Sequence, residues 1–146
     1  MLKLNGKNLF ELTKLFMKKK ISSIQELSNF IDELLEKWYK KFLLSWDLWV
    51  WKTEFTKQLA KKIWIKNISS PTYTYINNYD NKLLHWDFYR IEKKEDFLNL
   101  WILENIEDFE YICIEWPKFK EFYKNDDFIE LNIEKKGDAR IINYHL

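Results

Sequence analysis

The sequence contains few of the residues from which disulfides, proline turns and glycine-rich loops are built. Of its 146 residues, two are glycine, two are proline and one is cysteine. A single cysteine excludes an internal disulfide, and the apolar neighbours of Cys113 predict a buried thiol in a reducing cytoplasm. No apolar run approaches the roughly 18 residues of a membrane span, and the N-terminus has no signal-peptide pattern.

The chain also lacks an excess of charge of either sign. It has 24 lysines and arginines against 23 aspartates and glutamates, which gives a net charge of +1. This balance excludes a large positive field of the kind by which many proteins bind nucleic acid or membranes directly. A role on RNA would therefore need a partner.

Tryptophan is abundant where glycine is scarce. The chain has two glycines, far below the usual share of about 7%. It has eight tryptophans, a large excess of a residue that is ordinarily rare. Six tryptophans are suspect: Trp38 and Trp64 stand at helix stops, where a left-handed glycine is usual. Trp46, Trp49 and Trp51 stand directly before a Lys-Thr pair, and Trp101 interrupts an expected helix. Reading these six as glycine leaves eight glycines and two tryptophans, which is ordinary for both. The simplest cause is a genome that reads UGA as glycine, translated with a table that reads it as tryptophan.

The first half of the chain predicts two helices around a buried strand. Ser23 and Glu26 form a capping box before apolar residues at helical spacing, which predicts a helix over 23–37. The apolar run over 42–44 predicts a short buried strand. A second helix from Lys52 onward has one apolar face, formed by Phe55, Leu59 and Ile63.

The second half predicts several strands and one further helix. Alternation after Pro71 and the apolar segment that ends at Asp87 predict two strands, and a helix is expected over 97–106. A buried strand over 111–114 would deliver Glu115 at its carboxyl end. The segments FIELNI, EKKGD and ARIINY predict a hairpin with Gly137 in the turn. No repeat or linker divides the chain, which predicts a single domain over 17–146.

With glycine at the suspect positions, the segment from Trp46 to Thr53 becomes GDLGVGKT. It then fits the phosphate-loop pattern G-x-x-x-x-G-K-[ST], in the required order of strand, loop and helix. Such a loop wraps backbone N–H groups around a phosphate, which a Cβ obstructs, and the start of the next helix adds positive charge. As printed, with three indoles in the loop, the chain is predicted to bind nucleotide poorly.

Four segments together resemble the TsaE family, also called YjeE, of small bacterial ATPases of tRNA threonylcarbamoyladenosine synthesis. They are SWDLWVWKTEF, SSPTYTYINNY, LLHWDFYRI and ICIEWP, in this order and at compatible spacing. The resemblance implies an α/β fold of the P-loop NTPase kind. Its central sheet would be mostly parallel with antiparallel strands at one side, flanked by helices. The resemblance treats Trp86 and Trp116 as genuine tryptophans.

The resemblance also implies a set of site residues. Catalysis would rest on Lys52, Asp87 and Glu115, and Mg²⁺ would be held by Thr53, Asp87 and Glu115. ATP would be bound by the loop and by two further residues, namely Trp46, Asp47, Leu48, Trp49, Val50, Trp51, Lys52, Thr53, Thr72 and Arg140. The family acts in the cytoplasm, without a membrane, on TsaB and TsaD, and so on tRNA indirectly.

Several alternatives stay open at this stage. If all eight tryptophans are genuine, the chain would be a catalytically silent adaptor or an aromatic-rich binding module. A stacking platform would place its rings on one sheet face at period two, whereas these stand at helix ends and in a loop. Asp87 and Glu115 could be solvated strand ends, and His85 and His145 are interpreted as structural or exposed.

Two departures from the family pattern are visible. Residues 1–16 have no counterpart and are interpreted as a possible non-native upstream extension, with Met17 as a candidate start. Lys118 stands where many relatives have glutamate after the proline, which changes the charge beside the ICIEWP segment.

Overall fold

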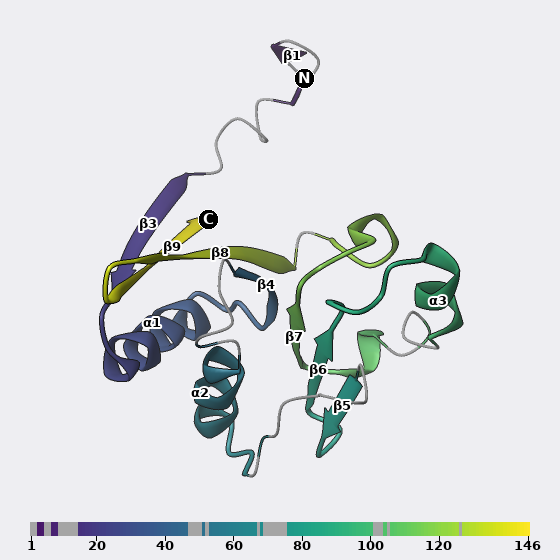
Figure 1. The fold of residues 1–146 in the computed structure, drawn as a ribbon, viewed down its shortest axis with the longest axis horizontal. Helices are drawn as coiled ribbons and strands as arrows, with labels where there is room; N and C mark the ends of the chain where they lie inside the picture. Colours follow the sequence, from purple (N-terminus) through teal and green to yellow (C-terminus); the bar gives the residue numbers. More distant parts are fainter. Residues whose placement is uncertain are drawn as a thin grey trace.

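The computed structural model describes residues 3–4, 7–8, 15–46, 51, 53–66, 68, 76–100, 104, 106–125 and 127–146. In this part of the chain, seven strands form one sheet that helices cover on both faces (Figure 1). Two further short strands, β1 (Lys3–Leu4) and β2 (Lys7–Asn8), pair with each other near the N-terminus.

The seven-stranded sheet has the order β3-β9-β8-β4-β7-β6-β5. Its four inner strands, β8, β4, β7 and β6, run parallel to one another. Strands β9 and β3 are antiparallel at one edge, and β5 is antiparallel at the other. The strand bounds are β3 (Phe16–Ile21), β4 (Lys41–Trp46), β5 (Ile76–Tyr79), β6 (Leu83–Asp87), β7 (Tyr111–Glu115), β8 (Phe128–Lys136) and β9 (Ala139–His145).

This topology confirms the predicted α/β fold with a parallel centre. The predicted hairpin is β8 and β9, and Gly137 begins its turn with φ 62°. Strand β5 adds an antiparallel strand at the second edge, where the sequence had predicted antiparallel strands at one side only.

The first helix, α1 (Ile24–Glu36), begins as its capping box predicts. The Ser23 hydroxyl accepts a hydrogen bond from the Glu26 N–H at 3.1 Å. The Glu26 carboxylate accepts from the Ser22 N–H at 2.7 Å, one residue earlier than in the usual box. Apolar residues at helical spacing then bury one face of α1, namely Leu27, Phe30, Ile31 and Leu34.

Helix α1 ends in a Schellman motif centred on Trp38. The Trp38 N–H donates to the Leu35 carbonyl at 2.9 Å, and the Tyr39 N–H donates to the Leu34 carbonyl at 3.1 Å. This pair of bonds requires a left-handed residue after the cap, which is usually glycine. Trp38 occupies that place with φ 68°.

The second helix, α2 (Glu54–Lys62), ends in the same way. The Trp64 N–H donates to the Lys61 carbonyl at 3.3 Å, and the Ile65 N–H donates to the Ala60 carbonyl at 2.9 Å. Trp64 is the left-handed residue, with φ 67°. Both predicted helix stops therefore have the backbone geometry of a glycine stop.

The third helix differs from its prediction. It was expected over 97–106, whereas α3 spans Lys94–Asn99 and Leu100 is extended with φ −72° and ψ 118°. Residues 101–103 and 105 of the expected helix lie outside the described residues. Glu95 and Asp96 lie in its first turn, where carboxylates interact favourably with the positive end of the helix dipole. Two short 3-10 helices, η2 (Ile106–Asp108) and η3 (Lys120–Phe122), lie on either side of β7 in the sequence.

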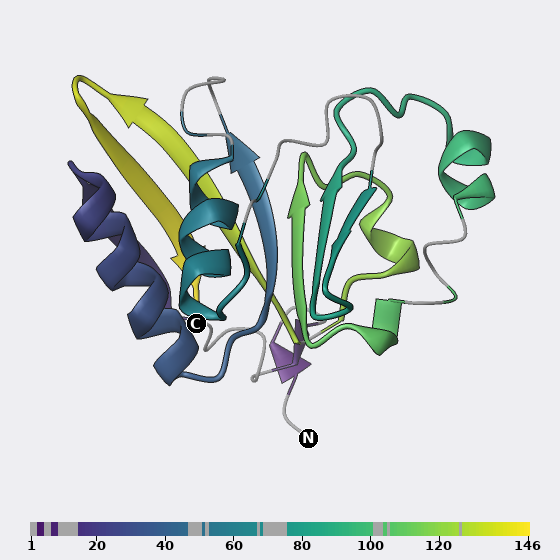
Figure 2. The same cartoon turned by 90° about the horizontal axis from the view of Figure 1, so that it is seen from below.

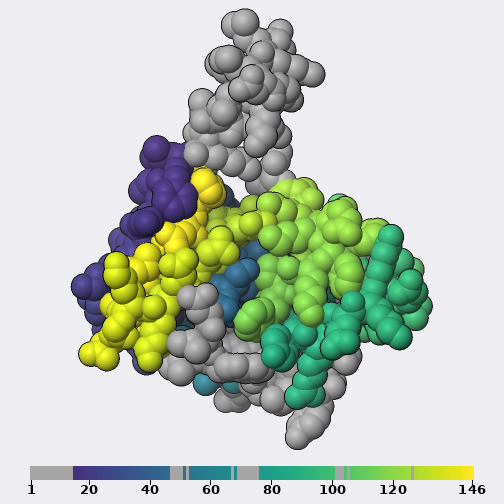
Figure 3. Space-filling model, turned by 45° about the horizontal axis from the view of Figure 1, so that its top comes forward, coloured from purple at the N-terminus to yellow at the C-terminus, as the bar shows by residue number. Residues whose placement is uncertain are grey.

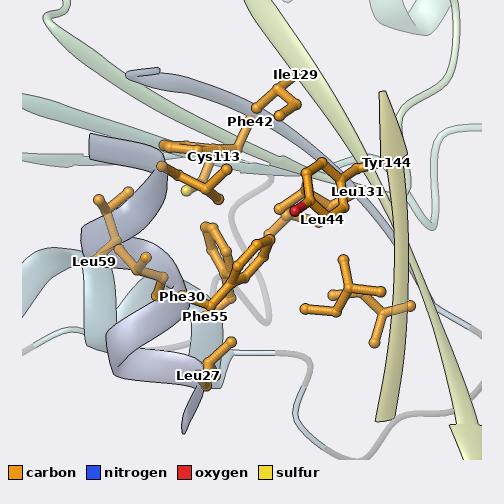
Figure 4. Close-up of a cluster of buried hydrophobic side chains, with 14 of the residues drawn as sticks. Leu27, Phe30, Phe42, Leu44, Phe55, Leu59, Cys113, Ile129, Leu131 and Tyr144 are labelled. Atoms are coloured by element: carbon orange, nitrogen blue, oxygen red, sulfur yellow. The ribbon is translucent and has the colours of Figure 1, made fainter. Parts of the chain in front are cut away.

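The sheet separates two hydrophobic cores. Helices α1 and α2 lie on one face and α3 on the other (Figure 2). The core under α1 and α2 includes Leu27, Phe30, Phe42, Leu44, Phe55, Leu59, Cys113, Ile129, Leu131 and Tyr144 (Figure 4). These residues come from both helices and from four neighbouring strands, so this core fixes α2 against the centre of the sheet.

The space-filling view shows which segments lie at the two ends of the molecule (Figure 3). The atoms of β3 and β9, purple and yellow, lie side by side at one end of the molecule, and the teal-green atoms around α3 lie at the other (Figure 3). Among the described residues, no helix is both long enough and apolar enough to span a membrane.

Candidate functional site

Two predicted site carboxylates lie at the carboxyl ends of the parallel strands. Asp87 is the last residue of β6, and Glu115 is the last residue of β7. The register pairs Asp87 with Glu115 and Glu115 with Leu44 of β4. The carboxylates are therefore neighbours in one row of the sheet, two residues before β4 ends at Trp46 and the predicted phosphate loop begins.

Both carboxylates belong to the sheet face that α1 and α2 cover. Side chains alternate along a strand, and Leu83 of β6 and Cys113 of β7 pack into the core on that face. Asp87 and Glu115 follow them by four and two residues, so their side chains are on the same face. Glu115 is 0% exposed and Asp87 is 7% exposed, which excludes the alternative that both are solvated strand ends.

Glu115 is hydrogen-bonded to a buried histidine. Nε2 of His85 lies 2.8 Å from Oε1 of Glu115, and neither side chain is exposed. His85 pairs with Cys113 across the two strands, so Glu115 is its diagonal neighbour on the same face. Sequence reasoning had interpreted His85 as structural or exposed, and had not predicted this contact.

The chain after Asp87 is held in a turn that joins the two strand ends. Oδ1 of Asp87 accepts a hydrogen bond from the Tyr89 N–H at 2.9 Å, which is an Asx-turn. The Phe88 N–H donates to the Glu115 carbonyl at 3.0 Å. These two hydrogen bonds, one within the turn and one from the turn to β7, thus hold Asp87 beside Glu115.

Lys118, which departs from the family pattern, stabilises the same turn. Its ammonium group donates to the carbonyl of Tyr89 at 2.9 Å and to the carbonyl of Ile91 at 2.8 Å. A lysine at this position therefore holds the segment that follows Asp87.

The predicted phosphate loop is described only in part. Several predicted site residues lie outside the described residues, namely Asp47, Leu48, Trp49, Val50, Lys52 and Thr72, as does Trp101. Trp46 ends β4 and packs into the core at 6% exposure. The backbone of Trp46 is not left-handed, so its conformation does not distinguish it from an ordinary core residue.

At the other end of the loop, Trp51 has the backbone of a glycine and lies beside a buried arginine. Its φ is 83°, in the region that side chains with a Cβ avoid. The guanidinium carbon of Arg140 lies 5.2 Å from the centroid of the Trp51 ring, and Arg140 is 7% exposed. The structure therefore brings Arg140 to the last glycine position of the loop pattern.

Thr53 lies at the N-terminal cap position of α2. Its carbonyl accepts from the Lys57 N–H at 2.9 Å, whereas its hydroxyl makes no capping hydrogen bond. The hydroxyl is thus not used to stabilise the start of the helix.

Left-handed backbone alone does not identify a misread tryptophan, because Trp116 also has φ 52°. The Trp116 ring lies 5.1 Å from the Tyr89 ring and packs against the core. In contrast, Trp38 is 83% exposed and Trp64 is 88% exposed. The combination of a left-handed backbone and an unpacked indole separates these two positions from Trp116.

No group of three or more histidine, cysteine, aspartate or glutamate side chains forms a metal cage among the described residues. Mg²⁺ prefers oxygen ligands and usually takes one or two protein carboxylates together with substrate phosphates and water. The donors available here are hard oxygen atoms, from Asp87, Glu115 and the Thr53 hydroxyl.

The sequence and fold were compared with known proteins. A sequence model of the family described as "Threonylcarbamoyl adenosine biosynthesis protein TsaE" matches residues 18–142. The "tRNA threonylcarbamoyladenosine biosynthesis protein TsaE" of Borreliella burgdorferi is 35% identical over 108 residues, which cover 70% of this chain and 79% of that protein.

Among solved structures, the crystal structure of YdiB from Bacillus subtilus has a similar fold. The TM-score is 0.66, with 24% sequence identity, and the match covers 91% of this chain and 86% of the other. From the family match over most of its length, we conclude that the chain belongs to the TsaE family of threonylcarbamoyl adenosine biosynthesis proteins.

Proposed function

We propose that this chain is the ATP-binding and hydrolysing component of the tRNA threonylcarbamoyladenosine modification system. In this proposal it acts in the cytoplasm on TsaB and TsaD and affects tRNA through them. The observation that carries the proposal is the position of the segment 46–53, which becomes G-x-x-x-x-G-K-[ST] with glycine at 46 and 51. It lies between β4 and α2, at the end of the sheet where Asp87 and Glu115 are buried side by side.

The loop and helix α2 would hold the phosphates of ATP. Backbone N–H groups over 46–51 would surround the anion, and the N-terminus of α2 would add its partial positive charge. Lys52 would contact the β and γ phosphates. Arg140, which lies at the end of the loop, would contact the nucleotide near its base.

Thr53, Asp87 and Glu115 would hold Mg²⁺ together with the phosphates. Their oxygen atoms suit this ion, which usually takes one or two protein carboxylates together with phosphates and water. When bound, the ion neutralises charge that develops on the phosphates. Glu115 and Asp87 would also place a water in line with the γ phosphate, and Thr72 would face that phosphate. Hydrolysis would then depend on positioning and charge rather than on covalent chemistry.

The same proposal includes glycine at the six suspect positions of the natural chain. Three of them, Trp38, Trp51 and Trp64, have φ between 67° and 83°. A left-handed backbone costs a residue with a Cβ about 1–2 kcal/mol, whereas glycine adopts it freely. At Trp38 and Trp64 this backbone comes with an indole that is 83% and 88% exposed, and the combination supports glycine at these two positions. The codons test whether the natural chain has glycine at these positions. UGA at the six positions would support the proposal, and UGG at all six would contradict it.

The test of function compares two chains, one as printed and one with glycine at all six positions. Titration calorimetry with ATP and Mg²⁺ is expected to detect binding to the glycine chain and little or none to the printed chain. Lys52→Ala in the glycine chain is expected to abolish binding, because the charge opposite the β and γ phosphates is lost. If the glycine chain folds and still binds no nucleotide, the ATPase proposal is wrong.

A pull-down with purified TsaB and TsaD tests the partners separately. The glycine chain is expected to associate with them in the presence of ATP. Nucleotide binding without association would indicate that the chain is an NTPase that acts without TsaB and TsaD. Association of the printed chain without nucleotide binding would favour the silent-adaptor alternative.

A further inference from the structure

His85 and Glu115 form a buried contact that the proposed roles do not use. The two side chains come from neighbouring parallel strands, β6 and β7, and both are fully buried. Their hydrogen bond of 2.8 Å joins a ring nitrogen to one oxygen of the proposed metal carboxylate. A polar pair buried this deeply costs desolvation free energy, which its hydrogen bond has to offset.

The surroundings of the ring determine which nitrogen carries the proton. Nδ1 of His85 is buried and has no hydrogen-bond partner among the described residues. A ring protonated at Nδ1 would leave that N–H without an acceptor there. A ring with its proton on Nε2 donates directly to Oε1 of Glu115, which can accept it. The contacts therefore favour the Nε2–H tautomer.

The fold explains how the histidine can control the carboxylate. Glu115 is the last residue of β7, and its side chain is fully buried. His85 lies inside β6, two residues before the strand ends, and its backbone is fixed by the pairing with Cys113. A ring on a fixed strand thus holds the carboxylate in one orientation.

We infer that His85 is a positioning residue that orients the Glu115 carboxylate toward the bound Mg²⁺–nucleotide by donating Nε2–H to Oε1. This inference rests on the proposed function for its consequence, but the tautomer and the hydrogen bond belong to the nucleotide-free chain. Hydrogen-bond partners that orient metal ligands typically contribute about 10–100-fold to metal affinity or activity. His85 is expected to contribute within that range.

The first experiment measures the tautomer in the nucleotide-free chain with glycine at the six positions. The chain has two histidines, His85 and His145, so His85→Gln assigns the signals in a ¹⁵N–¹H correlation spectrum. The expected result is an Nε2–H tautomer for His85 with a proton shifted by its bond to a carboxylate. An Nδ1–H tautomer would overturn the inference, whether or not nucleotide binds.

The second experiment compares two amide variants in the same chain. In His85→Gln, the side-chain amide reaches the position of Nε2 and keeps the donor. In His85→Asn, the shorter amide imitates Nδ1 and loses it. Titration of Mg²⁺ in the presence of a non-hydrolysable ATP analogue is expected to show about tenfold or greater weakening for His85→Asn. His85→Gln is expected to stay near the parent.

His145→Gln is the matched control, because His145 is exposed and at the end of β9. Thermal unfolding of each variant separates a lost contact from a lost fold. Equal Mg²⁺ affinity in the parent and both His85 variants would overturn the inference while leaving the ATPase proposal intact. No nucleotide binding by the parent would instead count against the proposed function, and the tautomer would then decide the inference by itself.

Discussion

Arg140 and Trp51 form a cation–π pair, with the guanidinium carbon 5.2 Å from the centroid of the indole ring. The arginine is buried, and its Nη1 also donates to the Ala139 carbonyl at 3.2 Å. With glycine at position 51, the guanidinium would lose the ring and face the backbone of the phosphate loop. A buried cation beside the proposed phosphate loop would be well placed to contact the nucleotide.

The first prediction concerns this arginine. In the chain with six glycines, Arg140→Gln is expected to weaken ATP binding about tenfold or more, because a hydrogen bond to a charged group contributes about 1.5–3 kcal/mol. Lys136→Gln is the control, since it removes the same charge from an exposed residue on the opposite face of the hairpin. Calorimetric titration measures both. Equal losses in the two variants would indicate a general effect of charge and no contact with the nucleotide.

The second prediction concerns the helix stops. Trp38→Gly and Trp64→Gly are each expected to raise the free energy of unfolding. Relief of left-handed strain contributes about 1–2 kcal/mol, and the extra freedom of glycine in the unfolded chain removes about 0.5–1 kcal/mol. A net gain of up to about 1.5 kcal/mol per site should therefore appear in urea unfolding.

Trp86→Gly serves as the contrasting variant for this test. Trp86 is 1% exposed and packs on Phe88 with ring centroids 5.4 Å apart. Its loss should lower stability by at least about 3–5 kcal/mol, the usual cost of truncating a buried aromatic residue. A loss of stability in Trp38→Gly or Trp64→Gly would show that the indole contributes there, contrary to the glycine proposal.

The sequence predicted much of this fold because the relevant signals are local. The Ser23 capping box, the helix stops at Trp38 and Trp64, and the hairpin turn at Gly137 each depend on a few adjacent residues. Asp87 and Glu115 could also be assigned to strand ends, since each follows a short apolar run.

Other features depend on pairing between distant segments and could not be predicted in the same way. The contact of His85 with Glu115 joins residues 30 positions apart and exists only in the observed register of β6 and β7. The start of α3 at Lys94 was missed because its first turn is charged and gives no apolar period. The two hydrogen bonds from Lys118 were not predicted because their acceptors are backbone carbonyls, which leave no pattern in the sequence.

The third prediction concerns this lysine. Lys118→Met keeps the aliphatic stem but removes both hydrogen bonds to the carbonyls of Tyr89 and Ile91. Charge-assisted bonds of this kind are stronger than neutral ones, so we expect a loss of about 1–3 kcal/mol in the free energy of unfolding. Lys19→Met, which removes an exposed ion pair with Glu33, should cost at most about 1 kcal/mol. Equal costs would show that the two carbonyl contacts add nothing.

The fourth prediction concerns acid stability. Burial by itself would raise the pKa of Glu130, but hydrogen bonds from Lys124 and Lys120 outweigh it, so that the pKa lies below its ordinary value of 4.5. The two ammonium groups lie 2.6 and 3.0 Å from the same carboxylate oxygen. A carboxyl group whose pKa is lower in the folded chain binds protons more readily when unfolded. Its contribution to stability is therefore complete above 4.5 and is lost as the pH falls through the lower, folded value.

Glu130→Gln isolates this contribution, because the amide is similar in shape but cannot ionise. At neutral pH the variant is expected to be less stable than the parent by about 1 kcal/mol, since the pair is partly exposed and solvent weakens it. The difference should stay constant down to pH 4.5 and shrink below it, as the parent carboxylate takes up its proton. Urea unfolding of both chains across this range measures the difference directly. A difference that persists after the carboxylate is protonated would mean that packing around Glu130, and not its charge, stabilises the start of β8.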